Sequence, residues 1–409
     1  MTSISVHPAF YTNKESGKLS ILNVLNRGSE IADFCAENAS AIDQNGVFAV
    51  KEFELIAELG LLAAPLRTEL GGLGLGIDAA VTEELLMLLK QIGRGNLVVG
   101  RVYEGHVNAL QLIQTFGTPE QIETYARDAR DRHKIFGVWN AEAEDGVKVR
   151  PLGNGNYRLE GAKTFCSGCG FVDRPFVNGS LTDDGDWQMC IVPMEQVATV
   201  SDPTWWQPSG MRATASFKVN FTGVELGASS LIGQPGDYFR QPWLTTGVIR
   251  FAAVQLGGAE ALFDATRQYL RDLNRTSDPY QQERLGRMAI ALESGNLWLR
   301  GAAELVKEYS PIFGGSPKQP NDQAEKLVSY ANMVRTAIEQ ICMDVMQLCE
   351  RSVGTRGLLP PHPMERIIRD LTLYLRQPVF DAALANVGQY ALSHPNPARS
   401  LWSYEFTDY

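Results

Sequence analysis

The stretch GAKTFCSGCG, residues Gly161–Gly170, separates several protein classes because it contains Cys166-Ser167-Gly168-Cys169. A C-x-x-C pair is typical of a redox dithiol or of half a zinc site. A structural zinc site needs a second ligand pair at short spacing, and the remaining cysteines and the five scattered histidines supply none. A redox dithiol opens a helix after a strand, and no helix is signalled after this pair. The sequence therefore predicts two packing cysteines on a β segment and no metal site.

The surrounding residues predict antiparallel β structure from about residue 136 to residue 224. Tyr157–Glu160 and Val147–Arg150 alternate apolar and polar residues, as half-buried strands do. Asn154-Gly155 lies between them and is typical of a hairpin turn. Phe217–Phe221 alternates in the same way and extends the β region.

The segments on both sides of the β region are helical. Thr118-Pro119-Glu120-Gln121 predicts a helix start with a capping box. Val248–Leu273 and Val328–Leu348 carry apolar residues at helical spacing. The fold class is therefore α+β and multidomain. We expect an N-terminal α-helical domain at residues 1–134, a middle β-barrel or sandwich domain at 135–235 and a C-terminal helical bundle at 236–409.

Composition excludes several classes of partner. The chain has 409 residues, of which 44% are hydrophobic and 21% charged, and its formal net charge is −10. No run of Lys and Arg stands out, so neither nucleic acid nor an anionic membrane is expected as the main partner. No apolar run reaches the roughly 18 residues that cross a bilayer, and the N-terminus lacks a hydrophobic signal core. We expect a cytoplasmic protein. The glycine-rich stretch Glu69–Gly76 follows a helical segment, so it is not expected to be a dinucleotide loop.

Five segments, in this order, resemble the acyl-CoA dehydrogenase superfamily of FAD-dependent enzymes over nearly the whole chain. They are GLLAAPLRTELGGLGLG, FGTPEQIETYARDARD, NYRLEGAKTFCSGCGFVDRPFV, PSGMRATASFKVNFTGVEL with LIG after it, and HPMERIIRDLTLY. The resemblance implies that family's fold, with a four-helix bundle as its C-terminal domain, and FAD as the cofactor. It also implies an obligate homo-oligomer, a homodimer or homotetramer, because subunits of the family share cofactor sites.

The resemblance further implies which residues contact the cofactor. They are Trp139, Asn140, Phe165, Cys166, Ser167, Arg275, Gln282, Gln347 and Gly354. Phe165 takes the place of an aromatic residue near the isoalloxazine ring, Cys166 contributes its backbone and Ser167 its hydroxyl. Arg275 takes the place of an arginine that reaches the pyrophosphate of a neighbouring subunit's FAD. The alternatives are that Phe165 is a core residue and that Arg275 and Gln282 are solvated surface residues.

The chain departs from the family pattern where the catalytic base is expected. Pro378 falls at the place of the usual glutamate, and proline cannot take a proton. Some members carry the base on the helix after the β domain, where Thr245–Arg250 holds no carboxylate. Asp381 is the nearest downstream acid, three residues further on. Glu142–Gly146 replaces a stretch that helps to hold coenzyme A, and its negative charges would repel an ADP-phosphate group.

Three functions stay open on these residues. The first is α,β-dehydrogenation of an acyl thioester, such as an acyl-CoA, with a displaced base. The second is a flavin-dependent monooxygenase of the same fold that acts on a substrate not attached to coenzyme A, with His106 as the candidate that steers proton transfer. The third is a catalytically inactive flavoprotein. The substrate and the electron acceptor are not identified by the sequence.

Overall fold

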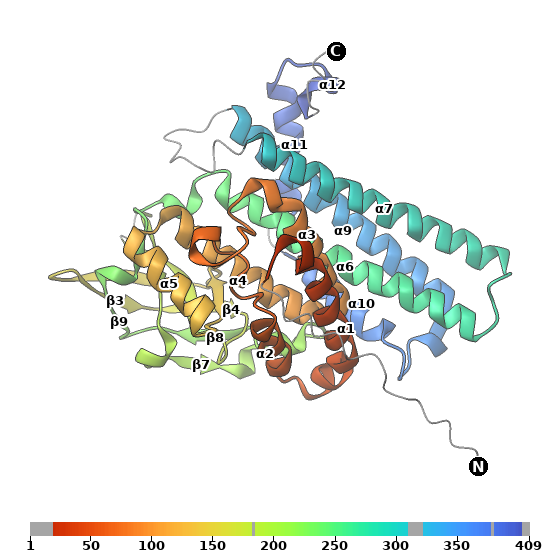
Figure 1. Ribbon diagram of the computed structural model, residues 1–409, viewed down its shortest axis with the longest axis horizontal. Coiled ribbons are helices and arrows are strands. Elements are labelled where there is room, and N and C mark those ends of the chain that lie inside the picture. Colours follow the sequence, from red (N-terminus) through yellow and green to blue (C-terminus); the bar gives the residue numbers. More distant parts are fainter. Residues whose placement is uncertain (1–18, 182–184, 310–321, 378–379, 403–409) are drawn as a thin grey trace.

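A computed structural model describes residues 19–181, 185–309, 322–377 and 380–402. The chain passes from N-terminal helices through a β region to long C-terminal helices, in the predicted order. Figure 1 shows the β region at the left, with the long helices extending to the right beside the N-terminal helices. The prediction of an α+β fold with a central β region is confirmed.

The N-terminal helices are amphipathic and pack their apolar faces together. They are α1 (Ile21–Asn45), α2 (Val50–Glu58), α3 (Thr82–Gly95), α4 (Leu97–Phe116) and α5 (Pro119–Asp131). The predicted capping box of α5 is confirmed. The hydroxyl of Thr118 accepts from the Gln121 N–H at 3.3 Å, and the Gln121 side chain accepts from the Thr118 N–H at 2.9 Å. Residues 69–76 form a partly buried turn between α2 and α3, with no strand before it.

Two sheets make up the β region. The larger sheet has seven strands: β10 (Leu231–Ile232), β6 (Trp187–Ile191), β5 (Arg174–Ser180), β2 (Lys148–Gly153), β3 (Asn156–Glu160) and β9 (Glu225–Gly227) in spatial order, with β1 (Phe136–Trp139) on β5. The smaller sheet has three strands: β4 (Ala162–Cys166), β8 (Phe217–Asn220) and β7 (Val200–Asp202). The predicted Asn154-Gly155 turn joins β2 to β3, and both of its residues have positive φ, as a hairpin turn of this type requires.

One feature of the β prediction is wrong, because the strands are not all antiparallel. β1 pairs with β5 in parallel, with Phe136 opposite Arg174, and β2 meets β5 in parallel at Lys148 and Ser180. A parallel pair needs a long connection. The segment between β1 and β5 provides it, and that segment also contains β4.

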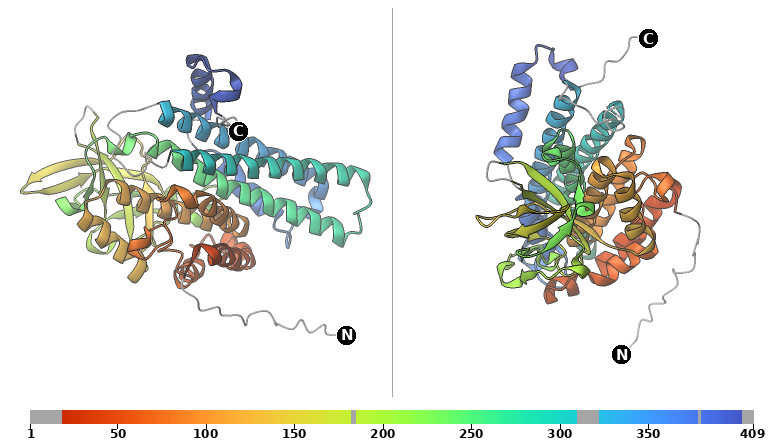
Figure 2. Two further views of the ribbon diagram at one scale, coloured as in Figure 1. Left: turned by 45° about the horizontal axis from the view of Figure 1, so that its top comes forward. Right: turned by 90° about the vertical axis from the view of Figure 1, so that its left-hand side faces the viewer.

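The C-terminal part is dominated by three long helices that lie side by side in both figures. They are α6 (Trp243–Asp272), α7 (Pro279–Glu308) and α9 (Asp322–Gly357), followed by α10 (Met364–Tyr374), α11 (Phe380–Ser393) and α12 (Ala398–Leu401). Figure 2 shows α11 and α12 projecting from the body. α3 crosses α6 so closely that a methyl group on Gly257 would collide with the backbone oxygen of Lys90. Lys90 in turn donates to Glu260 and Asn296 at 2.7 Å each, which joins α3 to α6 and α7.

In the part of the chain that the structure describes, no helix combines the length and apolar character needed to cross a membrane.

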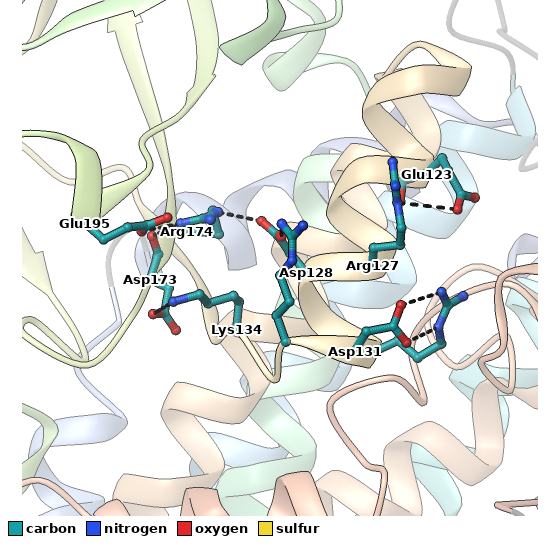
Figure 3. A network of polar contacts seen from close by, with 10 residues as sticks. Glu123, Arg127, Asp128, Asp131, Lys134, Asp173, Arg174 and Glu195 are labelled. Atoms are coloured by element: carbon teal, nitrogen blue, oxygen red, sulfur yellow. Dashed lines mark hydrogen bonds and ion pairs between the residues drawn. The ribbon is translucent and has the colours of Figure 1, made fainter.

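A buried arginine joins the β region to α5. Arg174, on β5, donates to Asp128 of α5 at 2.7 Å and to Glu195 at 2.5 Å (Figure 3). The hydrogen bond from Arg174 lowers the pKa of Glu195 to about 2. Asp128 also accepts from Arg132 at 2.8 Å, but the Arg132 side chain is 62% exposed, whereas that of Arg174 is 6% exposed. One carboxylate therefore has both a buried and an exposed arginine partner.

This shared carboxylate allows a matched stability test. We expect Arg174→Met to lower the free energy of unfolding by about 3 kcal/mol, because it leaves Asp128 as a buried carboxylate without its inner partner. Arg132→Met should cost less than about 1 kcal/mol, because an exposed ion pair contributes little. Urea unfolding followed by circular dichroism measures both variants. Equal losses would contradict a special role for the buried pair.

Candidate functional site

The quoted stretch forms a β-bulge that turns Phe165 outward. Lys163 pairs with Val219 and Cys166 with Phe217, so β4 has one extra residue between these pairs. Phe165 has φ of 52°, a left-handed conformation that is unfavourable for a residue with a large side chain. Its side chain is 52% exposed. Phe165 is therefore not a core residue, and the backbone is strained at the position where the ring is presented to solvent.

Two tryptophans extend this exposed aromatic surface. The ring of Trp205 meets that of Phe165 edge-on at 4.7 Å between centroids, and Trp206 lies 6.1 Å from Phe165. Trp206 is fixed by donation from its indole N–H to the Arg212 oxygen at 3.1 Å. An exposed aromatic cluster of this kind suits a flat apolar ligand. The two tryptophans are not among the predicted site residues, although their adjacency in a turn is visible in the sequence.

A chain of hydroxyls fixes the direction of the Ser167 proton. The Thr214 hydroxyl donates to the Met211 oxygen at 2.8 Å, so it can only accept from Ser216, 2.7 Å away. Ser216 therefore accepts from Ser167, 2.8 Å away. Because each hydroxyl has a single proton, the half-buried Ser167 oxygen is left as an acceptor for an incoming N–H or O–H donor.

Two further predicted residues, Trp139 on β1 and Asn140 just after it, are held by hydrogen bonds to β4 and to the turn after it. Trp139 is buried, and its indole N–H donates to the backbone oxygen of Ser167 at 2.9 Å. The buried Lys163 donates to the backbone oxygen of Asn140 at 3.1 Å and to the carboxylate of Glu142 at 2.6 Å. No described residue pairs with the buried side-chain oxygen of Asn140. The structure thus brings together Trp139, Asn140, Phe165 and Ser167.

The cysteines contribute packing, as predicted. Cys166 and Cys169 are buried free thiols. Burial raises the pKa of both thiols, that of Cys169 to about 11, so neither is a reactive thiolate at neutral pH.

Arg369 and Asp370, in the HPMERIIRDLTLY segment, tie the wall formed by Phe165, Ser167 and Trp205 to the C-terminal helices. Asp370 of α10 accepts from the Met211 N–H at 2.5 Å, and Arg369 donates to the Ser209 oxygen at 2.6 Å. A methyl group on Gly210 would collide with the Arg369 oxygen, so this crossing requires glycine. Burial raises the pKa of Asp370 to about 6.

The other predicted contacts gather at the far end of the long helices. Arg275 lies between α6 and α7 and pairs with Asp278 at 2.8 Å, while Gln282 donates to the Thr276 oxygen at 2.9 Å. Gln347 is exposed on α9, and Gly354 interrupts the helical dihedral angles near the end of α9. In Figure 1 this end of the helices lies at the right, away from β4. Within one chain, the predicted cofactor residues therefore form two separate groups.

The candidates for proton transfer are placed less favourably. His106 is fully buried, its Nε2 lies 2.8 Å from the Leu62 oxygen, and its Nδ1 accepts from the Phe136 N–H at 3.0 Å. Burial lowers the pKa of His106 to about 4, so the ring is neutral. The two contacts engage both of its nitrogens. Asp381 is exposed in the first turn of α11. Pro378 lies outside the described residues. The roles assigned to His106 and Asp381 stay predictions.

Helices on either side of a two-sheet β region are the architecture of the acyl-CoA dehydrogenase fold. A family model for the acyl-CoA dehydrogenase N-terminal domain matches residues 29–130, and one for the C-terminal domain matches residues 249–376. Together they span more than half of the chain, and the chain belongs to the acyl-CoA dehydrogenase family.

Relatives of the chain include two kinds of enzyme. It is 26% identical over 385 residues to dibenzothiophene monooxygenase of Rhodococcus erythropolis, covering 87% of this chain and 89% of the relative. It is 24% identical over 358 residues to a probable acyl-CoA dehydrogenase of Bacillus subtilis, covering 83% and 88%.

Solved structures share the fold. The dibenzothiophene monooxygenase TdsC of Paenibacillus sp. A11-2, solved with FMN and indole, aligns with a TM-score of 0.82 at 22% identity, covering 93% of this chain and all of TdsC. Butyryl-CoA dehydrogenase of Megasphaera elsdenii aligns with a TM-score of 0.79 at 17% identity, covering 91% and 98%.

The strain at Phe165 can be measured by two substitutions. We expect Phe165→Gly to be more stable than Phe165→Ala by about 1 kcal/mol, because only glycine adopts the left-handed conformation without penalty. At Phe217, on the partner strand β8, alanine should be the more stable of the two. Chemical denaturation of the four variants gives the comparison. If alanine were the more stable residue at position 165 as well, the bulge would be unstrained.

Proposed function

We propose that the chain is a flavin-dependent monooxygenase that oxidises a small substrate not attached to coenzyme A. The observation that carries the proposal is the wall of β4, where a strained, exposed Phe165 stands beside a Ser167 oxygen held as an acceptor. Relatedness to dibenzothiophene monooxygenase along most of the chain supports the choice of reaction.

The residues of this wall fit a flavin. A planar ring needs an apolar face and a few fixed polar partners along its edge. Phe165 and Trp205 offer the aromatic surface, and Ser167 and the unpartnered Asn140 oxygen offer acceptors for ring N–H groups. Trp139 and Cys166 are buried beneath the wall, so their part is to hold Ser167 and the backbone in place.

Bound in reduced form, a flavin supplies the electrons that activate molecular oxygen, so that one oxygen atom enters the substrate and the other leaves as water. The chain's own residues orient the ring and limit the access of water. Ser167 is suited to this reaction because its oxygen accepts from an N–H, and a reduced flavin carries a ring N–H at N5 that the oxidised form lacks.

The distribution of carboxylates favours oxygenation over dehydrogenation. A dehydrogenase needs a base to take the α-proton of the thioester. Leu375–Gln377 provide none, and Asp381 is exposed. Acyl-CoA dehydrogenases are nevertheless among the relatives, so dehydrogenation is the alternative that experiment must exclude.

The position of Arg275 and Gln282 supports a shared site between subunits. In Figure 1 the turn between α6 and α7, which holds Arg275, lies at the opposite end of the long helices from β4, so Arg275 and Gln282 would reach a flavin phosphate in a second copy of the chain. Ile290 and Leu297 are 72% and 57% exposed on α7, two turns apart on one face, and could be covered by that copy. An arginine at the pyrophosphate position favours FAD, whereas TdsC was solved with FMN. We infer a homo-oligomer and leave the choice of flavin to measurement. A cytoplasmic location stays part of this proposal.

A direct assay separates the two reactions. We expect the purified chain to bind FMN or FAD and, when supplied with reduced flavin and oxygen, to oxygenate at least one small substrate from a panel that includes indole, dibenzothiophene and benzoate. Mass spectrometry of the product and chromatography of the released flavin are the measurements. Mixed anaerobically with butyryl-CoA or octanoyl-CoA, the oxidised flavin should keep its colour, and bleaching would instead establish a dehydrogenase.

A control variant tests the assigned wall. Ser167→Ala should weaken binding of reduced flavin by roughly fivefold, since a net hydrogen bond is worth about 1 kcal/mol, and should affect oxidised flavin less. Ser393→Ala, at the exposed end of α11, should change neither. A chain that takes up no flavin at all would end the proposal.

The shared site predicts that assembly and flavin binding are lost together. We expect the double variant Ile290→Glu with Leu297→Glu to dissociate to monomers and to lose most of its flavin affinity. Light scattering after gel filtration and flavin titration are the measurements. Leu22→Glu, on the exposed face of α1, should leave both unchanged. A monomeric wild type that binds flavin tightly would show that Arg275 is not needed in trans.

A further inference from the structure

A buried ionic cluster lies between α4, α6 and α10, and the reaction proposed above does not use it. Arg101 donates to Glu104 at 3.0 Å, Asn108 donates to the other oxygen of Glu104, and Arg250 of α6 donates to the side-chain oxygen of Asn108. Glu104 and Arg250 are buried, while the Arg101 side chain is 22% exposed. Gly247 lies beside Arg250, since a methyl group there would be 3.5 Å from its Nη2, an ordinary contact distance.

The cluster lies beside the wall assigned to the flavin. A methyl group on Gly168 would lie 3.4 Å from Cγ1 of Val102, the residue after Arg101. A methyl group on Gly105 would lie 3.5 Å from Nη1 of Arg101 and 3.8 Å from Cα of Gly137, on β1. The Arg101–Gly105 turn of α4 therefore runs along both β1 and the turn after Ser167. The exposed part of Arg101 is within the region where a substrate would meet the flavin.

The charges of the cluster do not balance. Among the residues that the structure describes, Glu104 is the one carboxylate in ion-pair contact with Arg101, and no described carboxylate contacts Arg250. Two guanidinium groups thus share one carboxylate. Burial lowers the pKa of Arg250 to about 10, which shows that its charge is poorly compensated. An uncompensated buried charge is costly unless an anion can join it.

Unused donors point in the same direction. The Nε of Arg250 and the hydroxyl of Tyr374 are both buried, and no described residue accepts from either. Tyr374 ends α10, and the charges of Glu104 and Arg101 both act on its pKa. Arg250 also lines a mostly apolar pocket whose walls include Leu86 and Ile249, together with the acidic residue Asp78. Unpaired donors, excess positive charge and an adjoining apolar pocket are together what a small organic anion requires.

We propose that Arg101 and Arg250 bind the anionic group of a small organic acid (a carboxylate, sulfinate or sulfonate) at the end of the substrate site. Glu104 and Asn108 act as positioning residues that hold the two guanidinium groups. The proposal deepens the proposed function, since it rests on the substrate site lying beside the flavin wall and names the chemical class of the substrate.

Matched pairs of acid and neutral amide test the proposal by calorimetry at constant ionic strength, on the purified protein with and without flavin. The probes are benzoate against benzamide, acetate against acetamide, and benzenesulfonate against benzenesulfonamide. We expect at least one acid to bind about tenfold more tightly than its amide, the size of one charge-assisted hydrogen bond. If no acid is preferred over its amide, the proposal is overturned.

Variants of opposite sign identify the residues. Arg101→Gln should reduce the preference for the acid to about twofold or less. Glu104→Gln removes the competing negative charge and should strengthen binding of the acid by about threefold or more, with the amide unchanged. Arg94→Gln removes a surface arginine of α3 that pairs with Asp33 of α1, and it should leave the preference intact.

Each outcome is decisive. Weaker acid binding in Glu104→Gln would overturn the proposal even if Arg101→Gln failed to fold, and an equal loss in Arg94→Gln would show a mere effect of net charge. Flavin uptake is measured separately. A protein that binds flavin but shows no preference for acids would refute the anion site alone, and one that prefers acids but binds no flavin would refute the flavin function alone.

Discussion

The structure depends on the crossing of α10 with the segment before β8, where the hydrogen bond from the Met211 N–H to Asp370 joins the β region to the C-terminal helices. Glycine at position 210 lets the two backbones touch, and Arg369 fixes the neighbouring carbonyl. Met211 is itself left-handed, and it accepts from Thr214, the first member of the hydroxyl chain that ends at Ser167. The position of α10 is therefore coupled to the proton arrangement at the candidate site through a hydrogen bond between residues 159 apart in sequence.

Strain and burial are concentrated around the same few residues. Phe165, Met211 and Ala215 are all left-handed without being glycine, and all three lie on or beside the small sheet. Asp370 stays buried although burial raises its pKa to about 6. Each of these features opposes folding, and each places an atom on the wall around Ser167. Such a concentration is expected where an arrangement serves binding rather than stability.

Local signals in the sequence predicted the fold well and the site in part. The capping box at Thr118 and the turn at Asn154-Gly155 depend on neighbouring residues, so they could be recognised directly. The parallel pairing of β1 with β5 depends on residues far apart in the chain and could not. The resemblance to a family located Ser167, but its proton direction follows from Thr214 and Ser216, which only the folded chain brings near. His106 was selected for its chemistry at neutral pH. Glu104, two residues earlier, accepts from Arg101 and Asn108, and Asn108 in turn accepts from Arg250 on another helix.

The buried charges also bear on the choice between the two reactions of the family. An acyl chain is apolar and needs an apolar channel, because packing methylene groups against unpaired guanidinium donors forfeits the hydration of those donors without replacing it. In this chain Arg101, Glu104 and Arg250 occupy the space between α4 and α6 beside the flavin wall. A long acyl thioester would have to cover these charges, whereas a compact acid would neutralise the excess charge. Glu104 is also a poor substitute for the missing base, because Arg101 and Asn108 already hold both of its oxygens. The same cluster therefore disfavours binding of a fatty acyl substrate and favours binding of a polar, acidic substrate.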